Sequence, residues 1–166
     1  TQYSTYTRSL VPLLNKEGIY LVDEHETLTD EQAAFVDRYF MESVYPVLTP
    51  MAVDASRPFP LIRNKTLNIA ALLSSKQNSK ETVFATVQVP GVLPRLVPIP
   101  SEEGTTTFIL LEQIIERNIG LLFSNYKVLC AYPYRIMRNA DLTIDEDEAS
   151  DLLKEINHPP QSVSRM

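Results

Sequence analysis

The 166-residue chain is long enough for one domain with a sizeable core, and its 44% hydrophobic and 22% charged residues are ordinary for a globular protein. Its net charge of −6 argues against non-specific attraction to nucleic acid, and no apolar run approaches the roughly 20 residues that cross a bilayer. One cysteine excludes an internal disulfide framework and suits a reducing compartment.

The N-terminal residues 3–15 have apolar side chains at helical spacing, but Pro12 predicts a break or kink in any helix there. Gly18 fits a helix stop, and residues 19–22 are expected to form a short strand. The sequence begins without a methionine and without the layout of a signal peptide. We therefore expect it to be a piece of a longer chain.

A well-marked helix begins at Thr29, which forms a capping box with Gln32. Its inward side chains are expected to be Phe35, Val36, Tyr39 and Phe40. The prolines that follow between residues 46 and 60 favour turns and extended pieces. This stiff, basic segment either presents side chains to a partner or is only a crossover between two core elements.

The remaining elements alternate between strands and helices. Strands are predicted at 67–73, 82–89, 95–99, briefly at 107–110, and at 127–136, the third at an edge or irregular because of its prolines. Helices are predicted over 111–122, weakened near Gly120, and from Asp145 to Ile156. These elements predict an α+β fold, with a mixed sheet of about five strands packed with three or four helices.

Residues that could carry chemistry are few. The four glycines lie too far apart for a phosphate-binding loop. Two histidines and one cysteine give little support for a metal site, and we interpret His25 and His158 as surface residues. Between Arg57 and Arg95, however, six basic residues face one acid, so a local basic face is possible on an acidic domain.

Several sequence blocks occur in an order that resembles the middle, or head, domain of the long bacterial-type polyphosphate kinase. The blocks are PVLTPMAVD, PFP, NKTLN, FATVQVP, LPRLVPIP, the helix LLEQIIERNIGLLF and YRIMRNADL. The resemblance covers residues 18–156, and it departs from the family pattern at Arg57, where histidine is expected before Pro-Phe-Pro. It implies three parts: a helical segment 1–17 that ends a preceding domain, the head domain 18–158, and a truncated linker 159–166.

The resemblance implies an enzyme that transfers the terminal phosphate of ATP to polyphosphate through a phosphohistidine. In the family the nucleophile and most Mg-ATP contacts belong to C-terminal domains, which are missing here. We therefore expect no catalytic residue, metal or cofactor in this chain, Mg-ATP for the whole enzyme, and no activity of the chain alone. The enzyme is expected in the cytoplasm, with membrane association of the whole protein left open.

The expected role is to contact the catalytic domains of its own full-length chain and a homodimer partner. Candidate contact residues are Pro58, Phe59, Pro60, Tyr132 and Tyr134, with burial of Phe59 in the domain's own core as the alternative. Candidate phosphate contacts are Arg57, Arg63, Lys65 and Arg138, which could instead be turn residues or salt-bridge partners. A module that binds polyphosphate or a nucleotide through the basic face, and a stand-alone small-molecule enzyme, are the competing hypotheses.

Overall fold

The computed structural model describes residues 2–53, 62–77 and 81–137. The chain divides into two compact units, 1–136 and 137–166, so the described residues belong to the first unit apart from Met137. The helix predicted from Asp145 to Ile156 lies outside the described residues. Among the helices that are described, none is long and apolar enough to span a membrane.

The N-terminal helical segment contains a π turn directly before Pro12. It consists of α1 (Gln2–Thr5), the π-helical η1 (Tyr6–Leu10) and α2 (Val11–Lys16), and none of its residues is buried. The N–H of Val11 donates to the carbonyl of Tyr6, five residues back. Proline lacks an N–H and its ring collides with the carbonyl four residues back, so the predicted interruption takes the form of a wider turn.

Gly18 ends this segment, as predicted, with a φ of 75°. A side chain here would be strained, and its Cβ would lie 3.2 Å from the carbonyl oxygen of Gly104. The N–H of Thr106 donates to the carbonyl of Gly18 at 2.8 Å. Gly18 therefore lets the chain turn into its first strand in close contact with the loop before β6.

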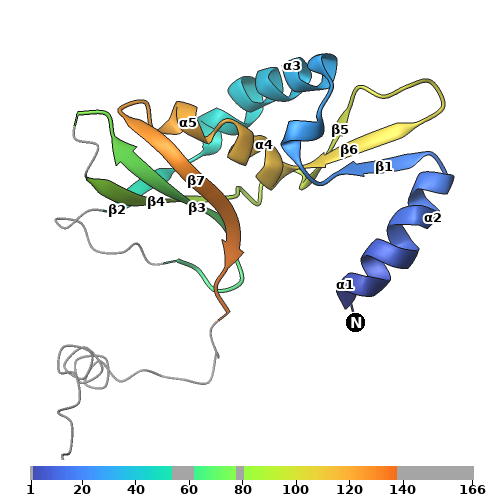
Figure 1. The fold of residues 1–166 in the computed structure, drawn as a ribbon, viewed down its shortest axis with the longest axis horizontal. Coiled ribbons are helices and arrows are strands. Elements are labelled where there is room, and N and C mark those ends of the chain that lie inside the picture. Colours follow the sequence, from blue (N-terminus) through green and yellow to red (C-terminus); the bar gives the residue numbers. More distant parts are fainter. Residues whose placement is uncertain (1, 54–61, 78–80, 138–166) are drawn as a thin grey trace, which may run out of the picture. The chain divides into compact units, whose positions relative to one another are not determined.

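The first sheet has three strands in the order β1-β6-β5 (Figure 1). These are β1 (Ile19–Val22), β6 (Thr106–Leu110) and β5 (Leu96–Ile99). β1 is parallel to β6, and β5 is antiparallel to it. The proline-rich β5 lies at an edge as predicted, because Pro98 cannot donate to a ladder. The segment that we expected to pair only briefly is the central strand.

The second sheet has four strands in the order β2-β4-β3-β7, with every neighbouring pair antiparallel. They are β2 (Pro50–Val53), β4 (Thr82–Gln88), β3 (Leu67–Ser75) and β7 (Tyr126–Arg135). The sequence predicted all but β2, an edge strand whose first residue is Pro50, a position where a missing N–H is tolerated. The register of β3 against β7 shifts between Leu72 and Leu73.

The other described helices lie between β1 and β2 and between β6 and β7 in the sequence. The first group is η2 (His25–Thr27), α3 (Asp30–Tyr39), η3 (Phe40–Val44) and η4 (Tyr45–Val47), and the second is α4 (Leu111–Arg117) and α5 (Ile119–Leu122). The predicted capping box of α3 is present: Gln32 N donates to Thr29 Oγ1 at 3.3 Å, and Thr29 N donates to Gln32 Oε1 at 3.2 Å. The break between α4 and α5 lies at Asn118, whose side chain donates to the carbonyl of Ile114, rather than at Gly120.

The hydrophobic core is one cluster of side chains from these helices and from both sheets. Its largest fully buried side chains are Phe40, Ile69, Leu73, Ile109, Leu111, Ile114, Ile115, Val36, Val44 and Val87. Each such side chain contributes about 1.5–3 kcal/mol by leaving water. Val36 and Phe40 are buried as predicted, and Phe35 and Tyr39 pack partly buried against the same core.

The α+β class predicted from the sequence is confirmed. The described strands number seven and form two sheets, whereas the sequence suggested about five strands in one mixed sheet. The difference arises because strand pairing is decided by contacts distant in sequence, which local patterns do not encode.

Candidate functional site

A basic turn, residues 63–66, precedes β3 and carries two of the predicted phosphate-contact residues. Arg63 and Lys65 are both exposed. The turn is closed by Thr66, whose Oγ1 donates to the carbonyl of Arg63 at 2.8 Å. Lys65 has a φ of 62°, the left-handed conformation that residues with a Cβ seldom adopt. Its N–H donates to the carbonyl of Ile136 at 2.8 Å, which ties the turn to the end of β7.

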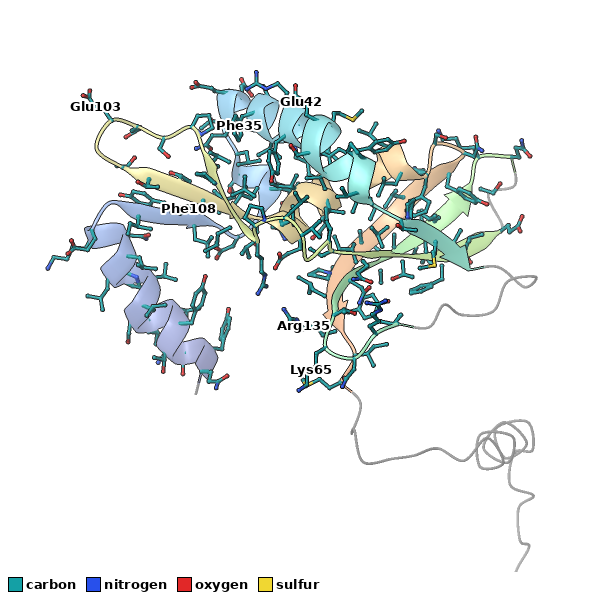
Figure 2. The ribbon with its side chains drawn as sticks, turned by 180° about the vertical axis from the view of Figure 1, so that it is seen from behind. Phe35, Glu42, Lys65, Glu103, Phe108 and Arg135 are labelled. Atoms are coloured by element: carbon teal, nitrogen blue, oxygen red, sulfur yellow. The ribbon has the colours of Figure 1, made fainter. Side chains whose placement is uncertain are left out.

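Arg135, the last residue of β7, lies beside this turn and was not among the predicted site residues. Its Nη1 is 3.4 Å from the carbonyl oxygen of Lys65, and the two residues lie next to each other in Figure 2. We call Arg63, Lys65 and Arg135 the basic end of the four-stranded sheet. The sequence block YRIM contains Arg135, but only the antiparallel pairing of Leu67 with Arg135 shows that it meets the turn.

A pocket of about 270 Å³ opens at the basic end. Its apolar part comes from side chains such as Leu67, Val89 and Leu111, and its polar part includes Arg95 and Arg135. The pocket therefore combines a hydrophobic surface with two guanidinium groups from segments that are far apart in the sequence.

Arg95 is held by a carboxylate, unlike Arg135. Its Nη2 lies 2.6 Å from Glu112 Oε1, and its Nε lies 3.2 and 3.3 Å from the two carboxylate oxygens. The Glu112 side chain is only 5% exposed, against 55% for Arg95. The hydrogen bond to Glu112 raises the pKa of Arg95, so this guanidinium stays charged. Its Nη1 takes no part in the pair.

The other predicted phosphate and contact residues are placed as follows. Arg57, Arg138 and the segment Pro58, Phe59 and Pro60 lie outside the described residues. Tyr132, on β7, is 67% exposed. The hydroxyl of Tyr134 is 2.7 Å from that of Thr86 on β4, so this ring spans the intervening strand β3.

Tyr132 belongs to a row of paired residues that crosses all four strands on one face of the sheet. Met51 pairs with Thr86, Thr86 with Ala70, and Ala70 with Tyr132. Paired residues share a face, so we call these four residues the outer row. The side chains at its two ends are exposed, Met51 at 42% and Tyr132 at 67%. Leu72, which lies near the row, is 38% exposed. The exposed ends of the row are apolar, whereas Thr86 between them is only 3% exposed.

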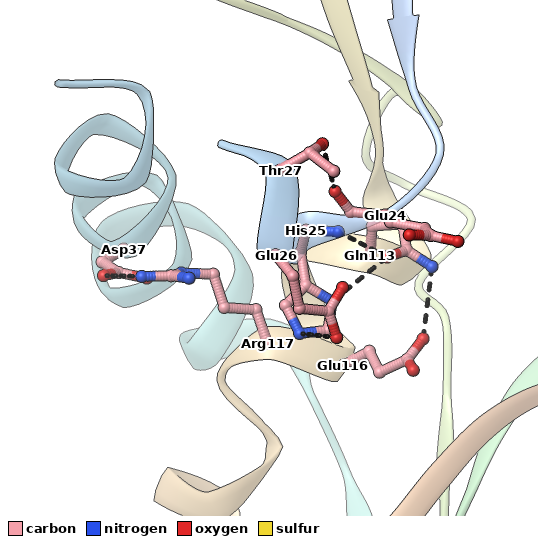
Figure 3. Close-up of polar contacts among 8 residues, drawn as sticks. All are labelled: Glu24, His25, Glu26, Thr27, Asp37, Gln113, Glu116 and Arg117. Carbon is pink, nitrogen blue, oxygen red and sulfur yellow. Dashed lines mark hydrogen bonds and ion pairs between the residues drawn. The ribbon is translucent and has the colours of Figure 1, made fainter. Parts of the chain in front are cut away.

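A polar cluster joins η2 to α4, and it corrects our interpretation of His25 as a surface residue. The His25 side chain is only 17% exposed. Its Nδ1 and its main-chain N both lie 3.1 Å from Gln113 Oε1, and its Nε2 lies 3.3 Å from Glu26 Oε1 (Figure 3). Because an amide oxygen only accepts, Nδ1 must carry a proton in this contact. The contact with Glu26 is an ion pair only when both ring nitrogens carry a proton.

Two carboxylates near this cluster have opposite pKa shifts. Gln113 Nε2 donates to Glu116 Oε2 at 3.3 Å, and burial raises the pKa of Glu116. Asp37 accepts from Arg117 Nε at 2.9 Å and from its Nη2 at 3.2 Å (Figure 3), and these hydrogen bonds lower the pKa of Asp37. In the part of the chain that the structure describes, no group of three histidine, cysteine or acidic residues could hold a metal ion.

Comparison with known proteins identifies the segment. A family model described as the polyphosphate kinase middle domain matches residues 31–161. The polyphosphate kinase of Lactiplantibacillus plantarum is 50% identical over 155 residues, which cover 93% of this chain and 21% of that protein. That of Halalkalibacterium halodurans is 46% identical over 155 residues, covering 93% of this chain and 22% of the relative.

A solved structure agrees with these matches. The crystal structure of polyphosphate kinase from Porphyromonas gingivalis superposes with a TM-score of 0.77 at 26% identity, covering 95% of this chain and 26% of that one. The chain thus spans roughly a fifth to a quarter of the length of these relatives.

Proposed function

The chain belongs to the polyphosphate kinase family, where it matches the middle domain, and we propose that its role is to contact neighbouring domains rather than to supply the reacting groups. The whole enzyme would transfer the terminal phosphate of ATP to polyphosphate, with Mg-ATP and the phosphohistidine in its C-terminal domains. On this proposal residues 18–158 form the head domain, 1–17 end the preceding domain and 159–166 begin a linker.

The observation that carries the proposal is the exposed outer row of the four-stranded sheet. Met51, Leu72 and Tyr132 expose between 38% and 67% of their surface on one face. Aromatic residues and methionine are enriched in the buried centres of protein interfaces. Exposed apolar side chains that gather on one face of a sheet are typical of interaction sites. We infer that the catalytic domains of the same full-length chain, or a homodimer partner, cover this row.

The N-terminal helical segment supports the same role. None of its residues is buried, and Tyr3, Leu10 and Leu13 are 79%, 51% and 62% exposed. Apolar side chains at helical spacing normally pack against another element. A preceding domain would provide one, as the assignment of 1–17 to the end of such a domain requires. The working compartment would be the cytoplasm, with association of the whole enzyme with a membrane left open.

A chimeric enzyme tests this role. The matching segment of the Lactiplantibacillus plantarum polyphosphate kinase is replaced by this chain, and transfer from ATP to polyphosphate is measured beside the isolated 166-residue chain. We expect activity in the chimera and none in the isolated chain. Tyr132→Asp in the chimera should lower activity or disrupt assembly, measured by size-exclusion chromatography, whereas Val92→Asp, at a site 82% exposed in a turn, should not. Turnover by the isolated chain would refute the proposal.

The second candidate function is binding of polyphosphate or a nucleotide through the basic face between Arg57 and Arg95. The observation that favours it is the exposure of Arg63 and Lys65 beside Arg135. Titration of the isolated chain with polyphosphate at low and moderate salt tests it, because binding through phosphate contacts weakens as salt rises. Absence of salt-sensitive binding would refute this second function and leave the contact role unaffected.

A further inference from the structure

The orientation of the Gln113 amide determines which nitrogen of His25 carries a proton. The main-chain N–H of His25 can only donate, so the amide atom 3.1 Å from it must be the oxygen. The ring Nδ1 lies 3.1 Å from the same oxygen and therefore also donates. The amide nitrogen of Gln113 in turn donates to Glu116 Oε2 at 3.3 Å, which agrees with this orientation. In neutral His25 the other ring nitrogen, Nε2, thus carries no proton.

The unprotonated Nε2 faces a carboxylate. It lies 3.3 Å from Glu26 Oε1, and two atoms that only accept hydrogen bonds cannot bond to each other. Once Nε2 takes up a proton, the same contact becomes a charge-assisted hydrogen bond. Histidine is the side chain that ordinarily changes its charge between pH 5 and 8. The geometry of the ring therefore suits the protonated form, and one proton decides whether Glu26 is attracted or repelled.

The charged groups around His25 come from three elements. η2 contributes Glu26, α4 contributes Glu116 and Arg117, and α3 contributes Asp37 (Figure 3). The chain leading into η2 adds two further acids, Asp23 and Glu24. Arg117 donates two hydrogen bonds to Asp37, so its positive charge is balanced by that carboxylate. Burial raises the pKa of Glu116, and the charge of His25 opposes that shift. Acids therefore remain to stabilise a charged ring.

A pocket beside the ring gives Glu26 room to move. It has a volume of about 520 Å³, and its lining includes Glu26 from η2, Asp37 from α3 and Leu121 from α5. The side chain of Glu26 is 70% exposed, against 17% for His25. Glu26 can therefore turn away into solvent without disturbing a packed side chain, whereas the ring stays beside Gln113 of α4.

From these observations we propose that His25 and Glu26 form a pH-sensitive latch between η2 and α4. With Nε2 protonated, Glu26 closes on the ring, and the bond from Nδ1 to Gln113 becomes charge-assisted as well. With Nε2 unprotonated, Glu26 leaves the ring and only the hydrogen bonds to Gln113 hold η2. One proton moves between solvent and Nε2, and no covalent bond to a heavy atom breaks.

The latch acts on the connection between the first sheet and the helices. η2 lies between β1 and α3 in the sequence, and its contacts with Gln113 fix this connection on α4. The connection should therefore be held more firmly as the pH falls. This inference goes beyond the contact role and the phosphate-binding function, and it depends on neither.

Amide hydrogen exchange of the 166-residue chain tests the latch. The main-chain N–H of His25 donates to Gln113, so it exchanges when η2 leaves α4. Its protection, relative to the intrinsic exchange rate at each pH, should be about fivefold greater at pH 5.5 than at pH 8. This factor is the upper end of what a partly exposed ion pair contributes. Equal protection at the two pH values would overturn the proposal.

Matched substitutions identify the partner of the ring. Glu26→Ala removes the acceptor of Nε2 and should reduce the ratio of protection between the two pH values to less than about twofold. In Glu26→Gln the new amide can donate to the unprotonated Nε2, so protection at pH 8 should be no lower than in the parent. Glu24→Ala, an equal loss of charge at an exposed neighbour, should keep the ratio of the parent. Equal reductions by Glu24→Ala and Glu26→Ala would refute the pairing.

Two further measurements separate His25 from the other groups of the polar cluster. Nitrogen NMR of the ring at pH 8 should show the proton on Nδ1, and a proton on Nε2 instead would overturn the proposal. Glu116→Gln cannot change its charge, so it should keep a ratio of protection above about twofold. A ratio near one in this variant would assign the pH dependence to Glu116 and refute the latch.

Discussion

Arg95 and Arg117, which contact helix residues, differ from the cations at the basic end in their hydrogen-bond partners. Arg117 donates two hydrogen bonds to Asp37, and Arg95 makes three contacts with the nearly buried Glu112. At the basic end, Lys65 and Arg135 are joined through a main-chain carbonyl. Cations of the first kind stabilise the fold, whereas those of the second kind keep their charge available to an external anion.

Arg95 connects the two regions, because it lines the pocket and also neutralises Glu112. A single pocket thus contains one guanidinium that the fold requires and one that it does not. The comparison predicts that substitutions at these two arginines, identical in chemistry, will have very different effects on stability.

The largest effect is expected for Arg95→Met. This change leaves the Glu112 carboxylate, 5% exposed, without its partner, and should lower the free energy of unfolding by about 2–3 kcal/mol. Unfolding in urea at pH 7 measures it.

Two controls decide whether this cost belongs to the carboxylate. Arg135→Met, at the other side of the same pocket, should change stability by less than about 0.5 kcal/mol. The double variant Arg95→Met/Glu112→Leu should recover most of the loss, because an apolar pair replaces the ion pair without leaving a buried charge. A double variant as unstable as Arg95→Met would attribute the cost to lost packing of the arginine stem instead.

At the basic end, the comparison predicts a change that stabilises the fold. Lys65→Gly relieves the left-handed main chain at a φ of 62°. Part of this gain is offset by the greater freedom of glycine in the unfolded chain, so we expect the variant to be about 0.5–1 kcal/mol more stable. The same variant should bind polyphosphate more weakly. A variant that is more stable but binds more weakly would show that Lys65 serves ligand binding and not the stability of the fold.

Lys65→Asn tests the conformational part of this argument alone. Asparagine tolerates the left-handed region better than lysine does, so its gain in stability should be smaller than that of glycine and still positive. A loss of stability in both variants would mean that the lysine side chain supports the turn, which would argue against Lys65 as a phosphate contact.

The sequence predicted those elements whose signals are local. The capping box Thr29–Gln32 fixed the start of α3, and Gly18 ended the first helical segment, because both involve neighbours in the chain. The apolar patterns of β3 and β4 were also sufficient. β2 was missed because Pro46 and Pro50 indicated turns, although an edge strand can begin with proline.

Arrangements that depend on pairing between distant residues could not be predicted. β1 and β6 are parallel neighbours, although Ile19 pairs with Thr106, far along the sequence. Arg135 reaches the basic turn only because β7 pairs with β3 in a register that brings it opposite Leu67. His25 is bonded to Gln113, 88 residues away, so no local pattern distinguishes it from a surface histidine. These contacts explain why local patterns could not predict the place of Arg135 or the partner of His25.

On the helix side, Asp37→Asn should destabilise the chain by about 0.5 kcal/mol at pH 7, the usual contribution of a partly exposed ion pair. Hydrogen bonds from Arg117 lower the pKa of Asp37 in the folded state. The stabilisation is therefore present above the unfolded pKa and is lost as the pH falls through the lower folded value. Urea unfolding should show a smaller difference in stability between Asp37→Asn and the parent at pH 3 than at pH 7. A difference independent of pH would contradict an electrostatic origin.

The smallest effect on stability is expected for a substitution of Glu116. Whereas Asp37→Asn should destabilise the chain at pH 7, this substitution should stabilise it. Burial raises the pKa of Glu116, and the nearby charge of Glu26 raises it further. The interaction with His25 and the hydrogen bond from Gln113 lower it, but they do not reverse the shift. A raised folded pKa means that stability is fully present below the unfolded value, about 4.3, and declines as the pH rises through the folded value. The glutamine of Glu116→Gln stays neutral at every pH. The free energy of unfolding of this variant should therefore equal that of the parent near pH 4 and exceed it slightly at pH 7. Glu103→Gln, at an exposed position, should follow the parent at both pH values. If Glu116→Gln were less stable at pH 7, the charge of Glu116 would be a stabilising partner of His25, and the polar cluster would hold its charges as the Arg117–Asp37 pair does.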